Sequence, residues 1–183
     1  MVRPSGKEAM LDAAEVVLTE QGAWRLTLDA VAEQAGVSKG GLLYHFPTKD
    51  ALLQALVARL AEKARAKRAA RRADLGDDVE AALRCDVEAC LLDDDRNPQL
   101  GAALISALAN CPDLKEPIRS FHVNRFAELG SLNLDEEAAI LLLAADGLRL
   151  METLNVSPFS ADQREALVNA MLAMAARLAR ATT

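Results

Sequence analysis

The 183-residue sequence is poor in aromatic residues, which make up only 3% of the chain, although 51% of its residues are hydrophobic. Alanine and leucine supply most of the apolar content. These residues favour helices, whereas strands prefer aromatic and β-branched side chains. The composition therefore predicts an all-α fold.

Cysteine and histidine are scarce as well. Cys85, Cys90 and Cys111 form no Cys-x-x-Cys pair and His45 and His122 are the only histidines, so ligands for a zinc site are lacking at a workable spacing. We expect buried, reduced thiols, with no metal and no cofactor. A redox switch between Cys85 and Cys90 is the weaker alternative, because a separation of five residues places them about 140° apart around a helix.

Long apolar runs are absent too. The longest, residues 138–145, is far shorter than the roughly 20 residues that span a bilayer. The N-terminus also shows no basic-then-apolar leader. We therefore expect a cytoplasmic protein that does not enter a membrane.

Positive charge is unevenly distributed along the chain. Residues 1–73 hold 12 lysines and arginines against 8 acidic residues, whereas residues 74–183 hold 9 against 19. A net charge of −6 would normally argue against nucleic acid as a partner, but phosphate attraction depends on a local basic face. The distribution permits nucleic-acid binding through the N-terminal part.

Apolar residues recur at helical spacing, and Gly, Pro, Asn, Asp or Ser separate the periodic segments. The spacing predicts about nine helices, which fall near residues 6–21, 28–35, 39–45, 49–73, 77–92, 98–110, 114–129, 134–154 and 161–179. We predict a three-helix head over residues 1–50 and a helical body over residues 51–183.

Residues 27–38 carry the signals of a helix-turn-helix. Thr27 stands at an N-cap position, Gly36 ends the short helix that follows, and Ser38 caps the next one. A tight turn containing glycine is what a helix-turn-helix needs in order to swing its second helix across the first.

Adjacent glycines, Gly40 and Gly41, lie in the predicted third helix, where each costs roughly 1 kcal/mol relative to alanine. Helix propensity would not select them, so something must approach this backbone closely. DNA is the natural candidate, because a helix N-terminus offers free N–H groups to phosphate and Lys39, Tyr44 and His45 supply further donors. The alternative, a tight helical hairpin with an incidental basic rim, does not explain the glycines.

The stretch from Thr27 to Leu53 resembles the signature of the tetracycline-repressor (TetR) family, above all in Val37-Ser38-Lys39-Gly40, in Leu43-Tyr44-His45-Phe46 and in Lys49. The resemblance covers about the first 55 residues. It implies a homodimer whose recognition helices enter successive major grooves of an inverted-repeat operator in double-stranded DNA. The residues that it implies to be DNA-binding are Thr27, Ser38, Lys39, Gly40, Gly41, Leu43, Tyr44, His45 and Lys49.

The predicted recognition helix has few side chains suited to reading base edges. Lys39 is placed to reach guanine, and Leu43 or Tyr44 to touch a thymine methyl, but no Arg, Asn or Gln is present. We expect phosphate contacts and DNA shape to carry much of the specificity. A basic run over residues 59–72 winds around its whole helix, so a solvated helix, or one paired with the acidic turn at residues 93–95, is favoured over a second nucleic-acid patch.

The last two predicted helices each carry a continuous apolar stripe that suits a dimer interface built as a four-helix bundle. The predicted interface residues are Leu143, Gly147, Leu150, Leu154, Leu167, Met171, Met174 and Leu178.

The family resemblance also implies a ligand pocket inside the body. Helical phase directs an almost wholly apolar set of side chains inward, which favours a neutral or weakly polar effector, with His122 or Arg125 as an anchor for a carboxylate or hydroxyl. The predicted ligand-binding residues are Leu83, Val87, Cys90, Leu104, Leu108, Phe121, His122, Arg125, Phe126 and Leu143.

These features predict a transcription repressor that a small apolar effector releases from its operator. The rival is a constitutive dimeric DNA-binding protein whose C-terminal domain only dimerises or binds a protein partner, and a closed apolar cavity would discriminate between the two. An enzyme is disfavoured, because Ser, His and acidic residues are not grouped in any nucleophile, metal or phosphate-loop motif.

Overall fold

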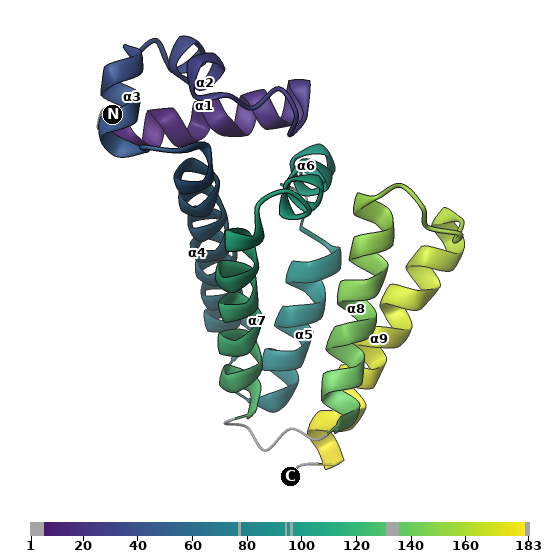
Figure 1. The fold of residues 1–183 in the computed structure, drawn as a ribbon. Helices are drawn as coiled ribbons and strands as arrows, with labels where there is room; N and C mark the ends of the chain where they lie inside the picture. Colours follow the sequence, from purple (N-terminus) through teal and green to yellow (C-terminus); the bar gives the residue numbers. More distant parts are fainter. Residues whose placement is uncertain (1–5, 77, 94, 96, 131–135, 182–183) are drawn as a thin grey trace. The chain divides into compact units, whose positions relative to one another are not determined.

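The computed structural model describes residues 6–76, 78–93, 95, 97–130 and 136–181, and within these ranges it contains only helices and turns. The predicted all-α class is confirmed. The helices are α1 (Gly6–Gln21), α2 (Leu28–Ala35), α3 (Lys39–His45), α4 (Lys49–Leu75), α5 (Val79–Leu91), α6 (Pro98–Leu108), the 3-10 turn η1 (Pro112–Leu114), α7 (Lys115–Gly130), α8 (Glu136–Thr153) and α9 (Ala161–Ala181) (Figure 1).

Most of the predicted helix boundaries agree with these bounds to within about two residues. The reason is local, because side-chain caps fix where a helix begins. Asp78 accepts a hydrogen bond from the backbone of Ala81 at 2.7 Å, and Asn97 accepts one from Leu100 at 2.9 Å. The predicted start of the eighth helix, near residue 134, lies outside the described residues.

The chain forms two compact units. Unit 1 comprises Met1–Ala61 and Asn97–Ser120, and unit 2 comprises Glu62–Arg96 and Phe121–Thr183. This division differs from the predicted one at residue 50, because the first turns of α4 and the whole of α6 pack with the N-terminal helices. Both α4 and α7 contribute to each unit.

Unit 1 has a single apolar core. Leucines of α1, α3 and the first half of α4 meet there, together with α6 and η1. The fully buried side chains include Leu11, Leu18, Leu42, Phe46 and Leu52. Because this core collects side chains from every helix of the unit, it holds α3 firmly from behind.

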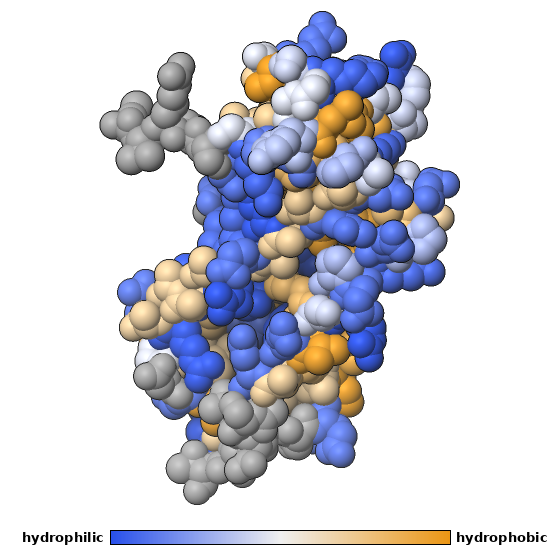
Figure 2. Space-filling model, turned by 60° about the vertical axis from the view of Figure 1, so that its left-hand side comes forward, coloured by the Kyte–Doolittle hydropathy of each residue, from blue (hydrophilic) through white to orange (hydrophobic). Residues whose placement is uncertain are grey.

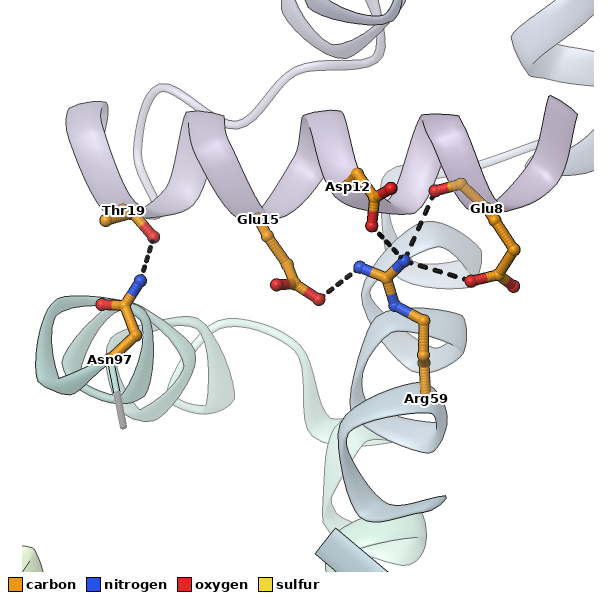
Figure 3. A network of polar contacts seen from close by, with 6 residues as sticks. All are labelled: Glu8, Asp12, Glu15, Thr19, Arg59 and Asn97. Carbon is orange, nitrogen blue, oxygen red and sulfur yellow. Dashed lines mark hydrogen bonds and ion pairs between the residues drawn. The ribbon is translucent and has the colours of Figure 1, made fainter. Parts of the chain in front are cut away.

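A polar network fastens α1 to α4 within the same unit (Figure 3). Arg59 donates to Asp12 at 2.7 Å and to the Glu8 carboxylate at 3.2 Å, and it also pairs with Glu15. The Arg59 side chain is only 10% exposed. The sequence predicted a solvated basic helix here, and for Arg59 that prediction is wrong, because the guanidinium points at three carboxylates of another helix.

A second bond closes unit 1 at the far end of α1. Asn97, which caps α6, donates from its side-chain nitrogen to the Thr19 hydroxyl at 2.9 Å (Figure 3). Together with Arg59 it fixes α1 at two points along its length, so that α1 follows any movement of α4 or α6.

Unit 2 is built around α5, which packs against both α8 and α9. Leu83, Val87 and Leu91 of α5 are buried against apolar side chains of α8 and α9. The core also buries charge, because Asp86 and Arg125 are each less than one tenth exposed. These two residues belong to a cavity described below.

Hydrophobic residues on the face shown in Figure 2 form separate small groups between hydrophilic ones. Among the described helices none combines the length and the apolar character needed to cross a membrane.

Candidate nucleic-acid interface

The turn between α2 and α3 has the geometry that the sequence predicted. The Thr27 hydroxyl accepts a hydrogen bond from the Ala30 backbone at 3.1 Å and so caps α2. Gly36 ends α2 in the left-handed region, at φ 66°, which glycine adopts without strain. Ser38 then caps α3 by accepting from the Gly41 backbone at 3.1 Å. The three local signals together redirect the chain into α3.

The two faces of α3 differ sharply. Leu42 and the C-cap residue Phe46 are 0% and 1% exposed and anchor the helix in the core of unit 1. On the other face Tyr44 is 84% exposed and Leu43 is 36% exposed, and His45 is exposed beside them. This face therefore presents donors and an apolar edge to a partner.

The glycine pair leaves room on the outward side of α3. A Cβ atom added at Gly40 would meet nothing within 4 Å, so no part of the described chain requires glycine there. A Cβ atom at Gly41 would lie 3.3 Å from the Ser38 hydroxyl and would crowd the N-cap. Gly41 therefore protects the cap, whereas no contact within the described part of the chain explains Gly40.

Two predicted DNA contacts have partners in the free protein. Lys39 forms an exposed ion pair with Asp29 at 2.8 Å. The Lys49 ammonium donates to the Ala23 carbonyl at 3.1 Å. The ion pair of Lys39 costs little to break, because both side chains are solvated. Lys49 pins the turn between α1 and α2.

An exposed aromatic residue next to Thr27 was not predicted as part of the interface. Trp24 is 75% exposed, and the guanidinium of Arg25 lies over its ring at 4.3 Å. Both residues line a groove of about 560 Å³ with Thr27 and Gln34. The sequence signal that could have identified these two residues is an adjacent aromatic residue and arginine in the loop just before the N-cap of α2.

Unit 2 contains an open cavity of about 530 Å³. Arg125 lies in its wall, donating from Nε to Asp86 at 2.6 Å and from Nη1 to Asp146 at 2.8 Å. Arg68 approaches Asp86 at 3.8 Å. The wall is thus charged at its most buried point.

The predicted ligand-binding residues do not come together in this cavity. Cys90, Phe121 and Arg125 line it. The remainder lie elsewhere: Leu83 and Val87 are sealed in the core of unit 2, Phe126 packs on Ala82 and Leu142, Leu104 and Leu108 belong to unit 1, Leu143 is 60% exposed, and His122 is half-buried outside the described wall. Helical phase identified inward faces but could not say which core each face joins.

Apart from Arg125, the charged members of the wall were not predicted from the sequence. Asp146 stands within an otherwise apolar stretch of α8, where a carboxylate needs a buried partner, whereas Asp86 of α5 has charged neighbours in Arg84 and Glu88. A charged residue in an apolar helix segment is the sequence signal that could have indicated a buried polar site. The expected apolar lining is therefore not what this cavity has.

The three cysteines are buried, as predicted. Within the described ranges they are not joined by disulfides. Burial raises the pKa of Cys90 to about 12, with the carboxylate of Asp146 adding to the effect. A thiol with so high a pKa is a poor nucleophile at neutral pH. The part of the chain that is described also holds no cluster of three potential metal ligands.

The predicted dimer residues fall into two groups. Leu143, Leu150 and Leu154 of α8 are 60%, 47% and 43% exposed, and Ile140 extends the same stripe at 60%. On α9, however, Leu178 is only 5% exposed, and the predicted residues Leu167, Met171 and Met174 are half-buried against the core of their own unit. A stripe facing a partner and one facing the chain's own core have the same sequence pattern. For Leu178 the prediction is wrong.

Small residues occupy much of the exposed face of α9 instead. Ala166, Ala170 and Ala173 are exposed, and Gly147 of α8 has open space where a Cβ atom would lie. Small side chains allow helices to approach closely.

Two family models match the chain. The model described as "Bacterial regulatory proteins, tetR family" covers residues 10–56, and "Tetracyclin repressor-like, C-terminal domain" covers residues 80–176. The first match contains α2, α3 and the turn between them, and the second contains α5 to α8 and most of α9.

Among curated proteins, the chain is similar to the HTH-type transcriptional regulator CymR of Pseudomonas putida, with 37% identity over 122 residues, which cover 64% of this chain and 58% of that protein. The HTH-type transcriptional regulator BetI of Stenotrophomonas maltophilia is 32% identical over 87 residues, covering 48% and 44% of the two chains. RutR of Escherichia coli is 45% identical over 51 residues, covering 28% and 24%. The matches thus span less than two thirds of each relative.

Solved structures share the whole fold. A TetR-family member from Streptomyces coelicolor A3 is 26% identical, with a TM-score of 0.71, and the match covers 93% of this chain and 98% of that one. A TetR transcription regulator from Haloarcula marismortui is 23% identical, with a TM-score of 0.68 and 98% coverage of both chains. The multidrug binding protein EbrR, solved with imidazole, is 25% identical, with a TM-score of 0.69 and coverage of 94% and 96%.

Proposed function

This chain belongs to the tetracycline-repressor (TetR) family, since one family model alone covers more than half of it, and we propose that it is a dimeric repressor that a small-molecule effector releases from an inverted-repeat operator. Such a protein works where the DNA is, so we place it in the cytoplasm.

The outward face of α3 carries this proposal. Its inward side is anchored by Leu42 and Phe46, whereas Tyr44 and His45 are exposed and Gly40 leaves open space beside the backbone. A short helix that is fixed from behind and open in front suits insertion into the major groove.

Each exposed group has a distinct role in the proposal. The open backbone at Gly40 lets a phosphate reach the N-terminus of α3. Lys39, released from Asp29, reaches a guanine edge or a phosphate. Tyr44 and His45 donate to the DNA backbone. Arg25, held over Trp24 next to Thr27, is proposed as a further phosphate contact from the start of α2.

The exposed stripe of α8 is proposed as the dimer interface. Ile140, Leu143, Leu150 and Leu154 form one apolar row, and such rows are unusual on a monomer surface. The alanines of α9 allow a second copy to pack closely beside it. Dimerisation joins two recognition helices and matches them to two half-sites.

The cavity in unit 2 is open and charged, and is not the closed apolar cavity expected for an effector-controlled repressor, so ligand control is proposed over the constitutive rival on the ligand-like size of the cavity alone. Helix α4 contributes to both units, and Arg59 of α4 is tied to three carboxylates of α1. A ligand that favours one arrangement of α4 would therefore change how α1 to α3 are presented to DNA.

Selection of bound sequences from a random DNA pool tests the proposal directly. We expect an inverted repeat to be enriched. Affinity for the selected site is then titrated at several salt concentrations. Lys39→Ala should weaken binding and lower the salt slope by about one unit, while Lys115→Ala, the same change at an exposed lysine on α7, should leave both unchanged. Failure to enrich any sequence, or equal titrations for the two variants, would refute DNA recognition by α3.

Sedimentation of a second pair of variants tests the dimer. Leu143→Glu places a charge in the α8 stripe and should give monomers that lose operator affinity. Ile105→Glu alters an apolar side chain of α6 in unit 1 that is 37% exposed and should remain dimeric. An intact dimer for Leu143→Glu would remove α8 from the interface.

A further inference from the structure

The two most exposed aromatic side chains of the chain lie in its helix-turn-helix segment. Tyr44 is 84% exposed on the outward face of α3, and Trp24 is 75% exposed in the turn before α2. By contrast, Phe46 is buried and Phe159 of the loop between α8 and α9 is 39% exposed. Tryptophan, tyrosine and arginine are enriched where proteins contact partners. The outward position of Trp24 therefore indicates a contact surface.

The turn that carries Trp24 is held in place by the rest of unit 1. Leu26 is 1% exposed and anchors the turn in the core. The Ala23 carbonyl accepts a hydrogen bond from the Lys49 ammonium at 3.1 Å, and Thr27 caps α2 directly after the turn. Trp24 therefore projects from a fixed support.

The Trp24 ring contacts two neighbours in this turn. A Cβ atom added at Gly22 would lie 3.5 Å from Cδ1 of Trp24 and 3.7 Å from its Nε1, so the ring lies beside the Gly22 backbone. The Arg25 guanidinium lies over the ring, 4.3 Å from its centre. An arginine that stacks by its flat face keeps the N–H groups at its edge available. The Arg25 side chain makes no hydrogen bond or ion pair with any residue that the structure describes.

The free donors of Arg25 favour an anionic partner at this end of the groove. The groove wall holds one cation, Arg25, and one acid, Glu33. Glu33 follows Thr27 by six residues, which places it about 9 Å further along α2. Asp29, the other acid of α2, does not line the groove and pairs with Lys39 of α3. A group that binds beside Trp24 is therefore closer to the cation than to either acid.

The position of the groove favours DNA as this partner. Thr27 lines the groove, and it is also one of the residues that the family signature implies to bind DNA. The groove is thus continuous with the proposed DNA interface. A DNA strand offers both kinds of contact that the pair can make, because its phosphates accept from a guanidinium and its deoxyribose rings present apolar surface to an indole.

We propose that a DNA strand beside the bases contacted by α3 crosses the Trp24–Arg25 pair: a phosphate oxygen accepts a hydrogen bond from Arg25, and the adjacent deoxyribose packs on the Trp24 ring. Trp24 contacts DNA itself and also holds the Arg25 guanidinium in place before binding, which lowers the cost of ordering it. The inference rests on the proposed function in taking DNA as the partner, and it extends the Arg25 contact proposed there to a joint site.

Fluorescence of the full chain tests the contact, because Trp24 is the only tryptophan. Acrylamide quenching is measured for the free protein and for its complex with the selected operator. A ring that passes from 75% exposed into an interface should show a quenching constant about threefold lower. An unchanged quenching constant at saturating operator, or a ring that is already protected in the free protein, would overturn the proposal.

A double-mutant cycle on operator binding tests the joint role. Arg25→Gln should weaken binding about threefold to tenfold and lower the salt slope by about one unit. Trp24→Ala should weaken binding about fivefold or more. The double variant should lose less than the product of the two single losses, because the two side chains act together. Losses that multiply fully, or parent-like binding by either single variant, would refute the joint site.

Two control variants separate contact with DNA from folding of the turn. Arg119→Gln makes the same change at an arginine of α7 that is 72% exposed and should bind DNA like the parent. Trp24→Phe keeps a flat ring beside Arg25 and should recover most of the affinity that Trp24→Ala loses. If Trp24→Phe binds as weakly as Trp24→Ala, or if Arg119→Gln loses as much as Arg25→Gln, the proposed contact is wrong.

The contact and the proposed regulator fail in different ways. If the selected operator is bound but acrylamide reaches Trp24 as in the free chain, the regulator stands and the contact is wrong. If no sequence is enriched, a mixed-sequence duplex at low salt still tests the contact, since binding to phosphates does not depend on sequence. Protection of Trp24 by that duplex supports the contact, and unchanged quenching overturns it.

Discussion

Both compact units surround an arginine with carboxylates, but at different depths. In unit 1 the side chain of Arg59 is 10% exposed and meets three acidic residues of α1, of which Asp12 is 61% exposed. In unit 2 the side chain of Arg125 is 5% exposed, and those of its partners Asp86 and Asp146 are 9% and 18% exposed. One network faces water and the other faces a cavity.

The carboxylates around the two arginines differ in burial, and burial decides what an ion pair contributes to stability. Carboxylates that keep their water lose little on pairing, so the Arg59 network works as a fastening between helices. Charges that have lost their water are costly to hold, and apolar packing would often stabilise a fold equally well. Each arginine keeps one buried nitrogen without a hydrogen-bond partner, Nε in Arg59 and Nη2 in Arg125, so the depth of the carboxylates is what distinguishes the two networks.

Removal of Arg125 should have the largest effect on stability. Arg125→Met leaves Asp86 and Asp146 buried without their shared partner, so we expect the free energy of unfolding to fall by about 3 to 5 kcal/mol. Urea denaturation at fixed protein concentration measures the change. Arg177→Met breaks an exposed pair with Glu137, at 61% and 60% exposure, and should change stability little. Similar losses for both variants would show that depth does not matter here.

Removal of Arg59 should have a smaller effect on stability. Arg59→Met keeps the apolar stem of the side chain and removes the partner of two half-exposed carboxylates, Glu8 and Asp12, and of Glu15, which is 24% exposed, for an expected loss of about 1 to 2 kcal/mol. Operator affinity should fall in addition, because α1 is no longer tied to α4. A loss as large as that of Arg125→Met would mean that the unit 1 network is not a surface fastening.

The two networks also show which contacts could be predicted from the sequence and which could not. Helix ends and the turn before α3 were predictable, because Thr27, Gly36 and Ser38 act on neighbours within a few residues. The partners of Arg59 and Arg125 lie 21 to 51 residues away along the chain, and no local pattern specifies such pairings. The outward residues of α3 could be predicted because they form a motif of contiguous residues. The charged residues of the cavity could be identified only once the fold had brought them together.

The α8 and α9 stripes show the same limit. Leu150 and Leu178 both continue apolar rows at helical spacing, but the first is 47% exposed and the second 5%. Periodicity states that one face of a helix is covered. Whether the cover is the chain's own core or a second copy depends on the packing of α5 between α8 and α9.

One glycine on an exposed helix face in each unit allows the two proposed interfaces to be compared. Gly40 of α3 and Gly147 of α8 both have open space where a Cβ atom would lie. Alanine at either position should therefore stabilise the isolated chain, by up to about 1 kcal/mol. Gly40→Ala should cost operator affinity and leave the dimer intact, whereas Gly147→Ala should weaken the dimer. Thermal melts, sedimentation and operator titration separate these effects. If either variant gains stability without losing its partner, that glycine is not at an interface.

The smallest expected effect concerns the pH dependence of stability that His122 contributes. Burial lowers the pKa of His122, and the guanidinium groups of Arg125, Arg149 and Arg68 lower it further, against an opposing effect of Asp146. The unfolded chain therefore takes up a proton first as the pH falls below about 6.5. Stability should be complete above that pH, fall just below it, and level off once the folded state is protonated as well.

Because His122 is half-exposed, water screens this field, and the loss should stay under about 1 kcal/mol. His122→Gln should flatten the unfolding free energy between about pH 7.5 and 5.5. A pH profile that His122→Gln does not alter would mean that burial and the neighbouring arginines do not lower the pKa of His122.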